Sequence, residues 1–266
     1  MRTALRMKKV PRDSLFVSEP NPMYFGNPGN DARASWTNLN WLKSRFHFAF
    51  AEFQGPPLNF GVLRVLNDDL VQPQRGFGTH PHSDMEIATF IVEGELTHQD
   101  SLGSKESLGR GSVQFMSAGK GIRHSERNEG LTPLRFLQLW IMPDTMNLKP
   151  NYGGFDGSTP EAVAARTNKF HHVVSSSRTS APTPIKLSQD VNIFQAEVTD
   201  HTLEFALGQN RQAYFVCAEG GATLRSKDDA VELEQGDACE LRGPMEPLTI
   251  TSHGKAYYVV VEMSKD

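Results

Sequence analysis

The sequence predicts an all-β protein built from two similar units, each a sandwich or barrel of short strands. Short runs rich in β-branched and aromatic residues recur at intervals of roughly ten residues, with turn residues between them. A weak internal repeat places the same pattern of runs and turn glycines in both halves of the chain. The best helix candidate lies at residues 159–166, where Pro160 suits the first turn.

The strand-like runs of the first half are separated by segments rich in Gly, Pro and Asn. A Glu93-Gly94 turn joins two of them as a hairpin, and Pro143 ends the last one. The runs are residues 46–51, 61–66, 87–92, 95–98, 112–116 and 135–142.

The internal repeat is read from two pairs of segments. Phe90-Ile-Val-Glu-Gly-Glu-Leu-Thr resembles Val216-Cys-Ala-Glu-Gly-Gly-Ala-Thr, and Gly111-Ser-Val-Gln-Phe resembles Gly236-Asp-Ala-Cys-Glu. The turn glycines are 17 residues apart in the first copy (94 to 111) and 16 in the second (220 to 236). We therefore expect an N-terminal domain over residues 1–150, a linker with a short helix over 151–184, and a C-terminal domain over 185–266.

Composition limits the function classes. The chain has 266 residues, of which 38% are hydrophobic and 22% charged, and a formal net charge of -4, so charge gives no reason to expect nucleic acid or an anionic membrane as the partner. No apolar run approaches the roughly 20 residues that span a bilayer, and the basic N-terminus lacks the apolar core of a secretion signal. The two cysteines, Cys217 and Cys239, fit a reducing compartment. We expect a cytoplasmic monomer, with the nucleus as the alternative location in a eukaryote.

Residues with metal-binding side chains gather in two short stretches. In Gly78-Thr-His-Pro-His-Ser-Asp-Met-Glu, an extended backbone projects His80 and His82 to one face, and Glu86 falls on the same alternation. In Gly121-Ile-Arg-His-Ser-Glu, the same rule puts His124 and Glu126 on one face. Imidazole and carboxylate are ligands of divalent metals, so the two stretches predict a metal site. Spacing alone does not choose between Glu86 and Glu126.

The second half of the chain offers no equivalent set. Counting from the repeat glycines places its counterparts at residues without metal-binding side chains, namely Ala206, Gly208, Thr249 and Thr251. We therefore expect one metal site, in the first half. His98 is interpreted as a residue behind the site or at the surface, and His47 as a packing or hydrogen-bonding residue.

Three motifs together resemble the pirin family and, within it, the bacterial pirin-like quercetin 2,3-dioxygenases. They are Gly76-Phe-Gly-Thr-His-Pro-His-Ser-Asp-Met-Glu-Ile, Met116-Ser-Ala-Gly-Lys-Gly-Ile-Arg-His-Ser-Glu and Leu137-Gln-Leu-Trp-Ile-Met-Pro, and the stretch His98-Gln-Asp-Ser-Leu-Gly adds to the same resemblance. The resemblance implies a bicupin, that is, two tandem cupin (jelly-roll-like) β-barrels with a metal only in the N-terminal one. It assigns the metal ligands to His80, His82, His124 and Glu126, which leaves Glu86 as a buried neighbour of the site. Ser83 departs from the family pattern, where arginine or lysine is common.

The same resemblance implies a function. The expected reaction is oxidative ring cleavage of quercetin or a related flavonol or enediol by O2, with release of carbon monoxide and with Glu126 as the proton acceptor. The expected cofactor is Fe2+, with Ni, Mn, Co, Cu and Zn as alternatives. An iron-binding, redox-responsive regulatory protein that acts as a transcription cofactor through a protein partner is the alternative function. A metal-dependent hydrolase or isomerase is a third, because this fold supports many reactions.

Overall fold

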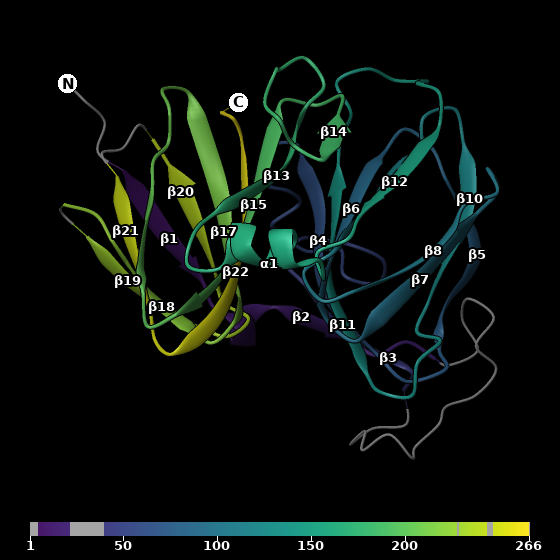
Figure 1. Cartoon of the computed structure of the whole chain (residues 1–266), viewed down its shortest axis with the longest axis horizontal. Coiled ribbons are helices and arrows are strands. Elements are labelled where there is room, and N and C mark those ends of the chain that lie inside the picture. The colour runs from purple at the N-terminus through teal and green to yellow at the C-terminus, as the bar shows by residue number, and fades with distance from the viewer. Residues whose placement is uncertain (1–4, 22–39, 228, 244–246, 266) are drawn as a thin grey trace. The chain divides into compact units, whose positions relative to one another are not determined.

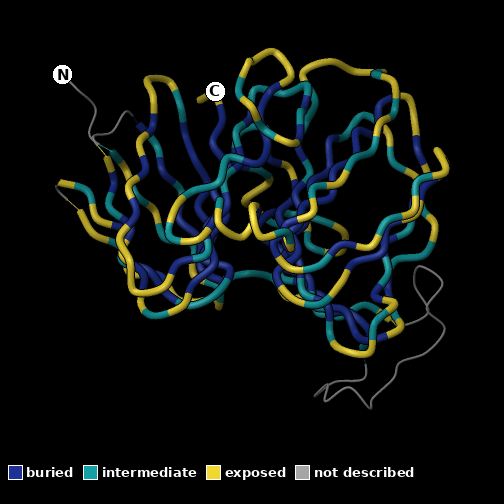
Figure 2. Tube along the Cα trace, in the orientation of Figure 1, coloured by how far each residue is buried: buried dark blue, intermediate teal, exposed yellow. Residues whose placement is uncertain are grey.

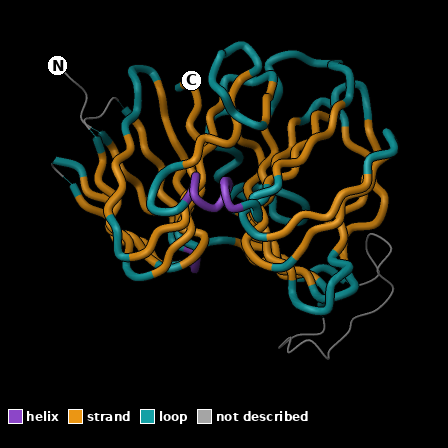
Figure 3. Tube along the Cα trace, in the orientation of Figure 1, coloured by secondary structure: helices purple, strands orange, loops and turns teal. Residues whose placement is uncertain are grey.

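Strands dominate both halves of the chain, as Figure 1 and Figure 3 show for the computed structural model. The structure describes residues 5–21, 40–227, 229–243 and 247–265. These residues form two contact units: the first unit is Phe16–Thr159, and the second unit is Met1–Leu15 together with Pro160–Asp266. Within the described ranges, no helix has the length and hydrophobicity that crossing a membrane requires.

The first unit consists of two antiparallel sheets. Its seven-stranded sheet has the order β12-β9-β6-β11-β4-β3-β2, and its four-stranded sheet has the order β5-β10-β7-β8. The strands are β2 (Phe16–Ser18), β3 (Leu42–Phe46), β4 (Leu63–Val71), β5 (Gly76–His82), β6 (Glu86–Glu93), β7 (Glu95–Asp100), β8 (Lys105–Gly109), β9 (Val113–Ser117), β10 (Ile122–Arg127), β11 (Leu134–Ile141) and β12 (Asn151–Phe155).

The core of this unit lies between the two sheets. Ile91 and Phe136 from the larger sheet pack in one buried cluster with Leu96 and Leu108 from the smaller sheet. Figure 2 shows the same division along the chain, with dark buried strands and exposed connecting loops. Each sheet therefore turns one face toward this core, while the central strands β6 and β9 of the larger sheet are buried on both faces.

The second unit repeats this arrangement strand by strand. Its sheets have the orders β1-β20-β17-β22-β15-β13-β14 and β16-β21-β18-β19, so β6, β7, β9 and β10 correspond to β17, β18, β20 and β21. Its elements are β1 (Arg6–Val10), η1 (Arg12–Ser14), α1 (Pro160–Arg166), β13 (His171–Ser176), β14 (Ile185–Leu187), β15 (Val191–Thr199), β16 (Thr202–Phe205), β17 (Arg211–Glu219), β18 (Gly221–Arg225), β19 (Ala230–Glu234), β20 (Ala238–Arg242), β21 (Leu248–Ser252) and β22 (Lys255–Ser264).

The matching orders confirm the predicted repeat and the fold of two tandem cupin barrels. The hairpin turns from which the repeat was predicted have similar backbone conformations, with Gly94 at φ 76° and Gly220 at φ 73°. A Cβ at Gly94 would lie 2.6 Å from a backbone oxygen and one at Gly220 only 2.2 Å from another. Each turn thus needs glycine both for its left-handed conformation and for close approach.

The contact units divide the chain differently from the expected boundaries at residues 150 and 185. β1 pairs with β20 from Arg6↔Arg242 to Val10↔Ala238, which joins the N-terminal strand to the second unit. The expected linker over 151–184 contains β12, α1 and β13, and α1 confirms the helix expected there. These differences arise from edge-strand pairing over long sequence separations, which leaves no local pattern in the sequence.

One expected strand is wrong. Residues 46–51 do not form a continuous strand, because β3 ends at Phe46 and Ala51 has φ 47°, outside the extended region. The regular strand lies before this run, at Leu42–Phe46, with alternating buried and half-buried residues. Two of the aromatic residues that suggested a strand, Phe46 and Phe50, line the cavity described below.

Candidate metal centre

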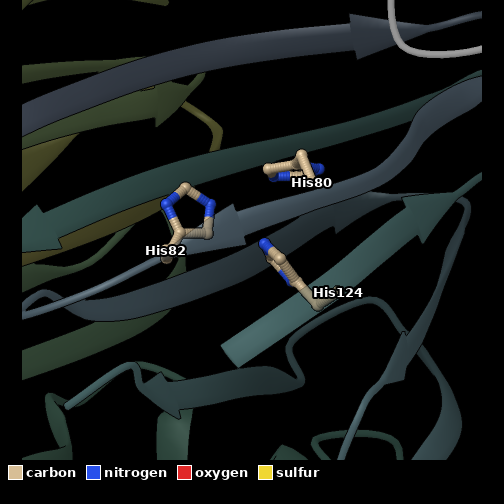
Figure 4. Close-up of side chains that lie close together, drawn as sticks. All are labelled: His80, His82 and His124. Carbon is tan, nitrogen blue, oxygen red and sulfur yellow. The ribbon is translucent and has the colours of Figure 1, made fainter. Parts of the chain in front are cut away.

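Two neighbouring strands of the smaller sheet bring the three predicted histidines together. β5 and β10 are antiparallel, with His80 directly opposite His124, and His82 follows two residues later on the same face of β5. The ring centroids are 4.5 Å apart for His80 and His124, 4.8 Å for His80 and His82, and 4.9 Å for His82 and His124. Each ring offers one nitrogen such that all three lie within 4.8 Å of one another, and Figure 4 shows the rings converging.

Hydrogen bonds to the ring nitrogens leave suitable donor atoms for a metal. His80 Nδ1 lies 2.7 Å from the carbonyl oxygen of Gly78, which places the proton on Nδ1 and the lone pair on Nε2. His124 is buried and its Nε2 has no hydrogen-bond partner among the described residues. A buried polar atom of this kind is costly unless something binds it. The three rings therefore fit a bound metal ion.

Burial keeps the histidines in the form that binds metals. Burial first, and then the nearby His124 and His80, lower the pKa of His82 to about 4. Burial lowers the pKa of His124 to about 2, and the neighbouring imidazoles His80 and His98 add to this shift. Both rings are neutral at pH 7, and a metal binds neutral imidazole.

Glu126 lies on the same strand as His124, after a bulge in the pairing with β5. Gln138 Nε2 donates to both carboxylate oxygens of Glu126 at 2.9 Å, and Trp140 Nε1 donates to Gln138 Oε1 at 3.2 Å. Thr89 Oγ1 adds a longer contact of 3.5 Å. The carboxylate is held in place beside the histidines but is not one of the ligand atoms within 4.8 Å of one another.

Glu86 lies in a different sheet. β5 ends at His82, and the chain turns at Asp84, with φ 46°, before β6 begins at Glu86. The alternation that aligned Glu86 with the histidines therefore stops at the end of β5. Glu86 is buried at the start of β6 and is not among the residues that line the cavity beside the histidines.

A cavity of about 590 Å3 opens beside the histidines. His80, His82 and Glu126 line one side of it, while its apolar walls include aromatic rings from the segment after β3 and from β11. Phe50 and Trp140 pack edge to face in this wall, with centroids 5.0 Å apart. The surface of this cavity is mainly apolar, although polar side chains also line it, and such a cavity is typical of a site for a small organic molecule.

Asp69 is a cavity residue that the sequence reasoning missed. It lies within β4, is 1% exposed, and accepts a hydrogen bond from the hydroxyl of Ser44. Burial raises the pKa of Asp69 to about 8, although the hydrogen bond from Ser44 works to lower it. The negative charges of Asp68 and Glu126 add to the increase. At neutral pH its carboxyl therefore holds a proton that can be donated in a hydrogen bond. Two adjacent aspartates inside an apolar strand were the available signal.

Comparisons with known proteins agree with the fold. The family model named Pirin matches residues 29–141, and the model described as the quercetinase C-terminal cupin domain matches residues 173–263. A pirin-like protein of Caulobacter vibrioides is 40% identical over 197 residues, which are 71% of this chain and 83% of the relative.

Two matches from Escherichia coli, one to a sequence and one to a solved structure, extend the comparison. Quercetin 2,3-dioxygenase of strain K12 is 50% identical over 117 residues, 43% of this chain and 51% of the relative. The crystal structure of the bacterial pirin YhhW in complex with nickel(II) superposes with a TM-score of 0.79 and 26% identity, covering 98% of this chain and 100% of the other.

Proposed function

Because this chain belongs to the pirin family, we propose that it is a metal-dependent dioxygenase that cleaves quercetin, or a related flavonol or enediol, with O2. The observation that carries the proposal is the convergence of His80, His82 and His124 beside an apolar cavity of about 590 Å3. Cavities of roughly 300–1,000 Å3 hold drug-sized organic molecules. The name of the Escherichia coli K12 relative supports this substrate class.

The proposed ligands are one nitrogen from each of His80, His82 and His124, with a carboxylate oxygen of Glu126 as the fourth. The unpartnered Nε2 of His124 supports this set, and so does the position of Glu126 in the cavity wall. We propose Fe2+ as the ion, although Ni, Mn, Co, Cu and Zn also suit nitrogen and oxygen donors, and YhhW was crystallised with nickel(II). A bound ion supplies Lewis acidity toward a substrate oxygen and redox chemistry with O2.

The side chains of the cavity position the substrate and move its proton. The carboxylate of Glu126 accepts the proton of the substrate's 3-hydroxyl, and Gln138 keeps that carboxylate oriented. Phe50 and Trp140 offer flat apolar surfaces for an aromatic substrate and keep water out. Asp69 donates a hydrogen bond to a substrate oxygen from the opposite strand of the wall.

The test is turnover with a defined metal. The purified protein is stripped, reloaded separately with Fe2+, Mn2+, Ni2+, Co2+ or Cu2+, and mixed with quercetin while O2 uptake and carbon monoxide release are recorded. The proposal expects both signals in equal amounts with at least one ion. Absence of turnover with every ion would overturn it and favour the regulatory metal-binding function.

Two variants test the site. His80→Ala should lose both metal content and turnover, because it removes a ligand. His201→Ala is the matched control, because His201 is exposed and belongs to the second unit; it should retain both. Full metal content in His80→Ala would overturn the ligand assignment.

A further inference from the structure

A second histidine and a carboxylate lie behind His124, on the neighbouring strand β7. Strands β7 and β10 pair with Asp100 opposite His124 and with His98 opposite Glu126. His98 and Asp100 have side chains that are 3% and 0% exposed. Neither residue lines the cavity of about 590 Å3. Their place in the fold is therefore next to a proposed ligand and away from the substrate.

Asp100 is held so that one particular oxygen faces His98. Its Oδ1 accepts the backbone N–H groups of Leu102 at 2.8 Å and Ser104 at 3.1 Å, while its Oδ2 lies 3.1 Å from His98 Nε2. Burial works to raise the pKa of Asp100, but the hydrogen bonds from His98, Ser104 and Leu102 outweigh burial and lower it. The group is a carboxylate at neutral pH and can only accept hydrogen bonds.

The protons of the two imidazoles follow from this carboxylate. A neutral His98 carries its proton on Nε2, facing the carboxylate, so its Nδ1 has the lone pair. That Nδ1 lies 3.5 Å from Nδ1 of His124, which must then carry a proton and donate it. His124 is left with its lone pair on Nε2, the atom that is buried without a partner.

We infer that Asp100 and His98 are positioning residues that hold His124 in the tautomer whose Nε2 binds the metal. The inference rests on the metal site of the proposed function, but not on its reaction. A hydrogen bond to the ring nitrogen that does not bind the metal commonly fixes the orientation and tautomer of a ligand histidine. Here two side chains act in series, the carboxylate of Asp100 on His98 and the imidazole of His98 on His124. Tyr152 stacks on His98 at 4.1 Å and 13° and donates to Glu106 at 2.8 Å, which keeps the His98 ring in register.

Asp100→Asn is a sharp test because Oδ1 is already committed to two backbone N–H groups. The amide oxygen of the asparagine must stay there, so its NH2 group faces His98 Nε2. His98 then has to accept at Nε2 and carry its proton on Nδ1, facing His124. His124 must respond by moving its own proton to Nε2, where the metal would bind.

The tautomers are read by 15N NMR of histidine-labelled, metal-free protein at pH 7.5, and the Kd for Ni2+ by calorimetry. The wild type should show the His124 proton on Nδ1, and Asp100→Asn should show it on Nε2. Asp100→Asn should bind Ni2+ roughly 10–100-fold more weakly. Glu95→Gln, which removes one charge from an exposed position on the same strand, should bind within about twofold of the wild type.

Two further variants keep the test decisive if Asp100→Asn does not fold. His98→Gln can still accept the Nδ1–H of His124 and should retain the tautomer, whereas His98→Leu offers no acceptor and should lose it. A wild-type His124 proton on Nε2, or an Asp100→Asn protein with the wild-type tautomer and Kd, would overturn the inference. A protein that shows the expected tautomers and Ni2+ affinities but does not turn over quercetin supports the inference and refutes only the proposed reaction.

Discussion

Asp69→Asn should make the first unit more stable at pH 8, and the gain should grow with pH. The folded protein holds the Asp69 proton up to a pKa of about 8, raised from 3.8 chiefly by burial. The unfolded chain releases it near 3.8, so between these values the folded state binds more protons and the free energy of unfolding falls as pH rises. At 1.36 kcal/mol per pKa unit, the loss approaches roughly 5 kcal/mol at pH 8. Asparagine has nearly the same shape and does not titrate.

The assay is urea unfolding of EDTA-treated protein at pH 5 and pH 8, followed by tryptophan fluorescence. The chain's three tryptophans all lie outside the sequence ranges of the second unit, and the two that the structure describes, Trp41 and Trp140, belong to the first unit, so fluorescence reports on the first unit. Asp68→Asn is the matched control, because Arg135 binds Asp68 through two contacts of 2.8 Å. Breaking this largely buried pair should cost about 3–5 kcal/mol at both pH values. An Asp69→Asn stability difference from wild type that does not increase between pH 5 and pH 8 would refute the reasoning.

Three further outcomes follow from the structure. Gln138→Leu should lower the free energy of unfolding by about 1–3 kcal/mol, because Glu126 loses both hydrogen bonds, and a urea midpoint equal to that of the wild type would contradict this. Burial lowers the pKa of His47 to about 4, so the free energy of unfolding should fall by roughly 3 kcal/mol as pH falls from 6.5 toward 4. His47→Gln should lose less free energy of unfolding over this range, with each protein compared with its own value at pH 8. Gly94→Ala should destabilise the hairpin more than Gly103→Ala in thermal unfolding, because both glycines have positive φ but only Gly94 would bring its Cβ to 2.6 Å from a backbone oxygen.

Local patterns in the sequence predicted the parts of the fold that depend on local chemistry. The spacing of Gly94 and Gly111 matched that of Gly220 and Gly236 because a left-handed turn residue is needed at each of these points. Alternation within single strands predicted that His80 and His82 share one face of their strand, and in the structure His124 lies opposite His80 on the neighbouring strand. The repeat and the histidine cluster were therefore accessible without a structure.

Features that depend on which strands meet were not accessible. β1 pairs with β20 although Lys8 and Glu240, which form a salt bridge of 3.0 Å, are more than two hundred residues apart in the chain. Asp69 lies after the strand-like run at residues 61–66, yet it is buried within β4, where Ser44 on the neighbouring strand donates a hydrogen bond to it. Spacing alone did not separate Glu86 from Glu126, because it does not reveal the turn at Asp84, where the alternation of β5 ends.

The shared strand order shows how two similar barrels differ at one place. His98 lies four residues after Gly94 and pairs with Glu126, while Leu224 lies four residues after Gly220 and pairs with Ile250. Likewise, His80 pairs with His124, and Phe205 pairs with Leu248. The counterparts of His80, His124 and Glu126 are therefore Phe205, Leu248 and Ile250, each one residue away from the position obtained by counting along the sequence, and Leu224 is the counterpart of His98.

All four counterparts belong to the buried core of the second unit. Where the first unit buries imidazole and carboxylate groups that need hydrogen bonds or a metal to offset desolvation, the second unit buries hydrocarbon, which stabilises folding directly. The same ladder of strands thus supports a histidine cluster in one copy and a hydrocarbon core in the other. The two copies differ in a few alternating side chains on β5, β7 and β10, so the potential to bind a metal depends on those residues and not on the barrel fold.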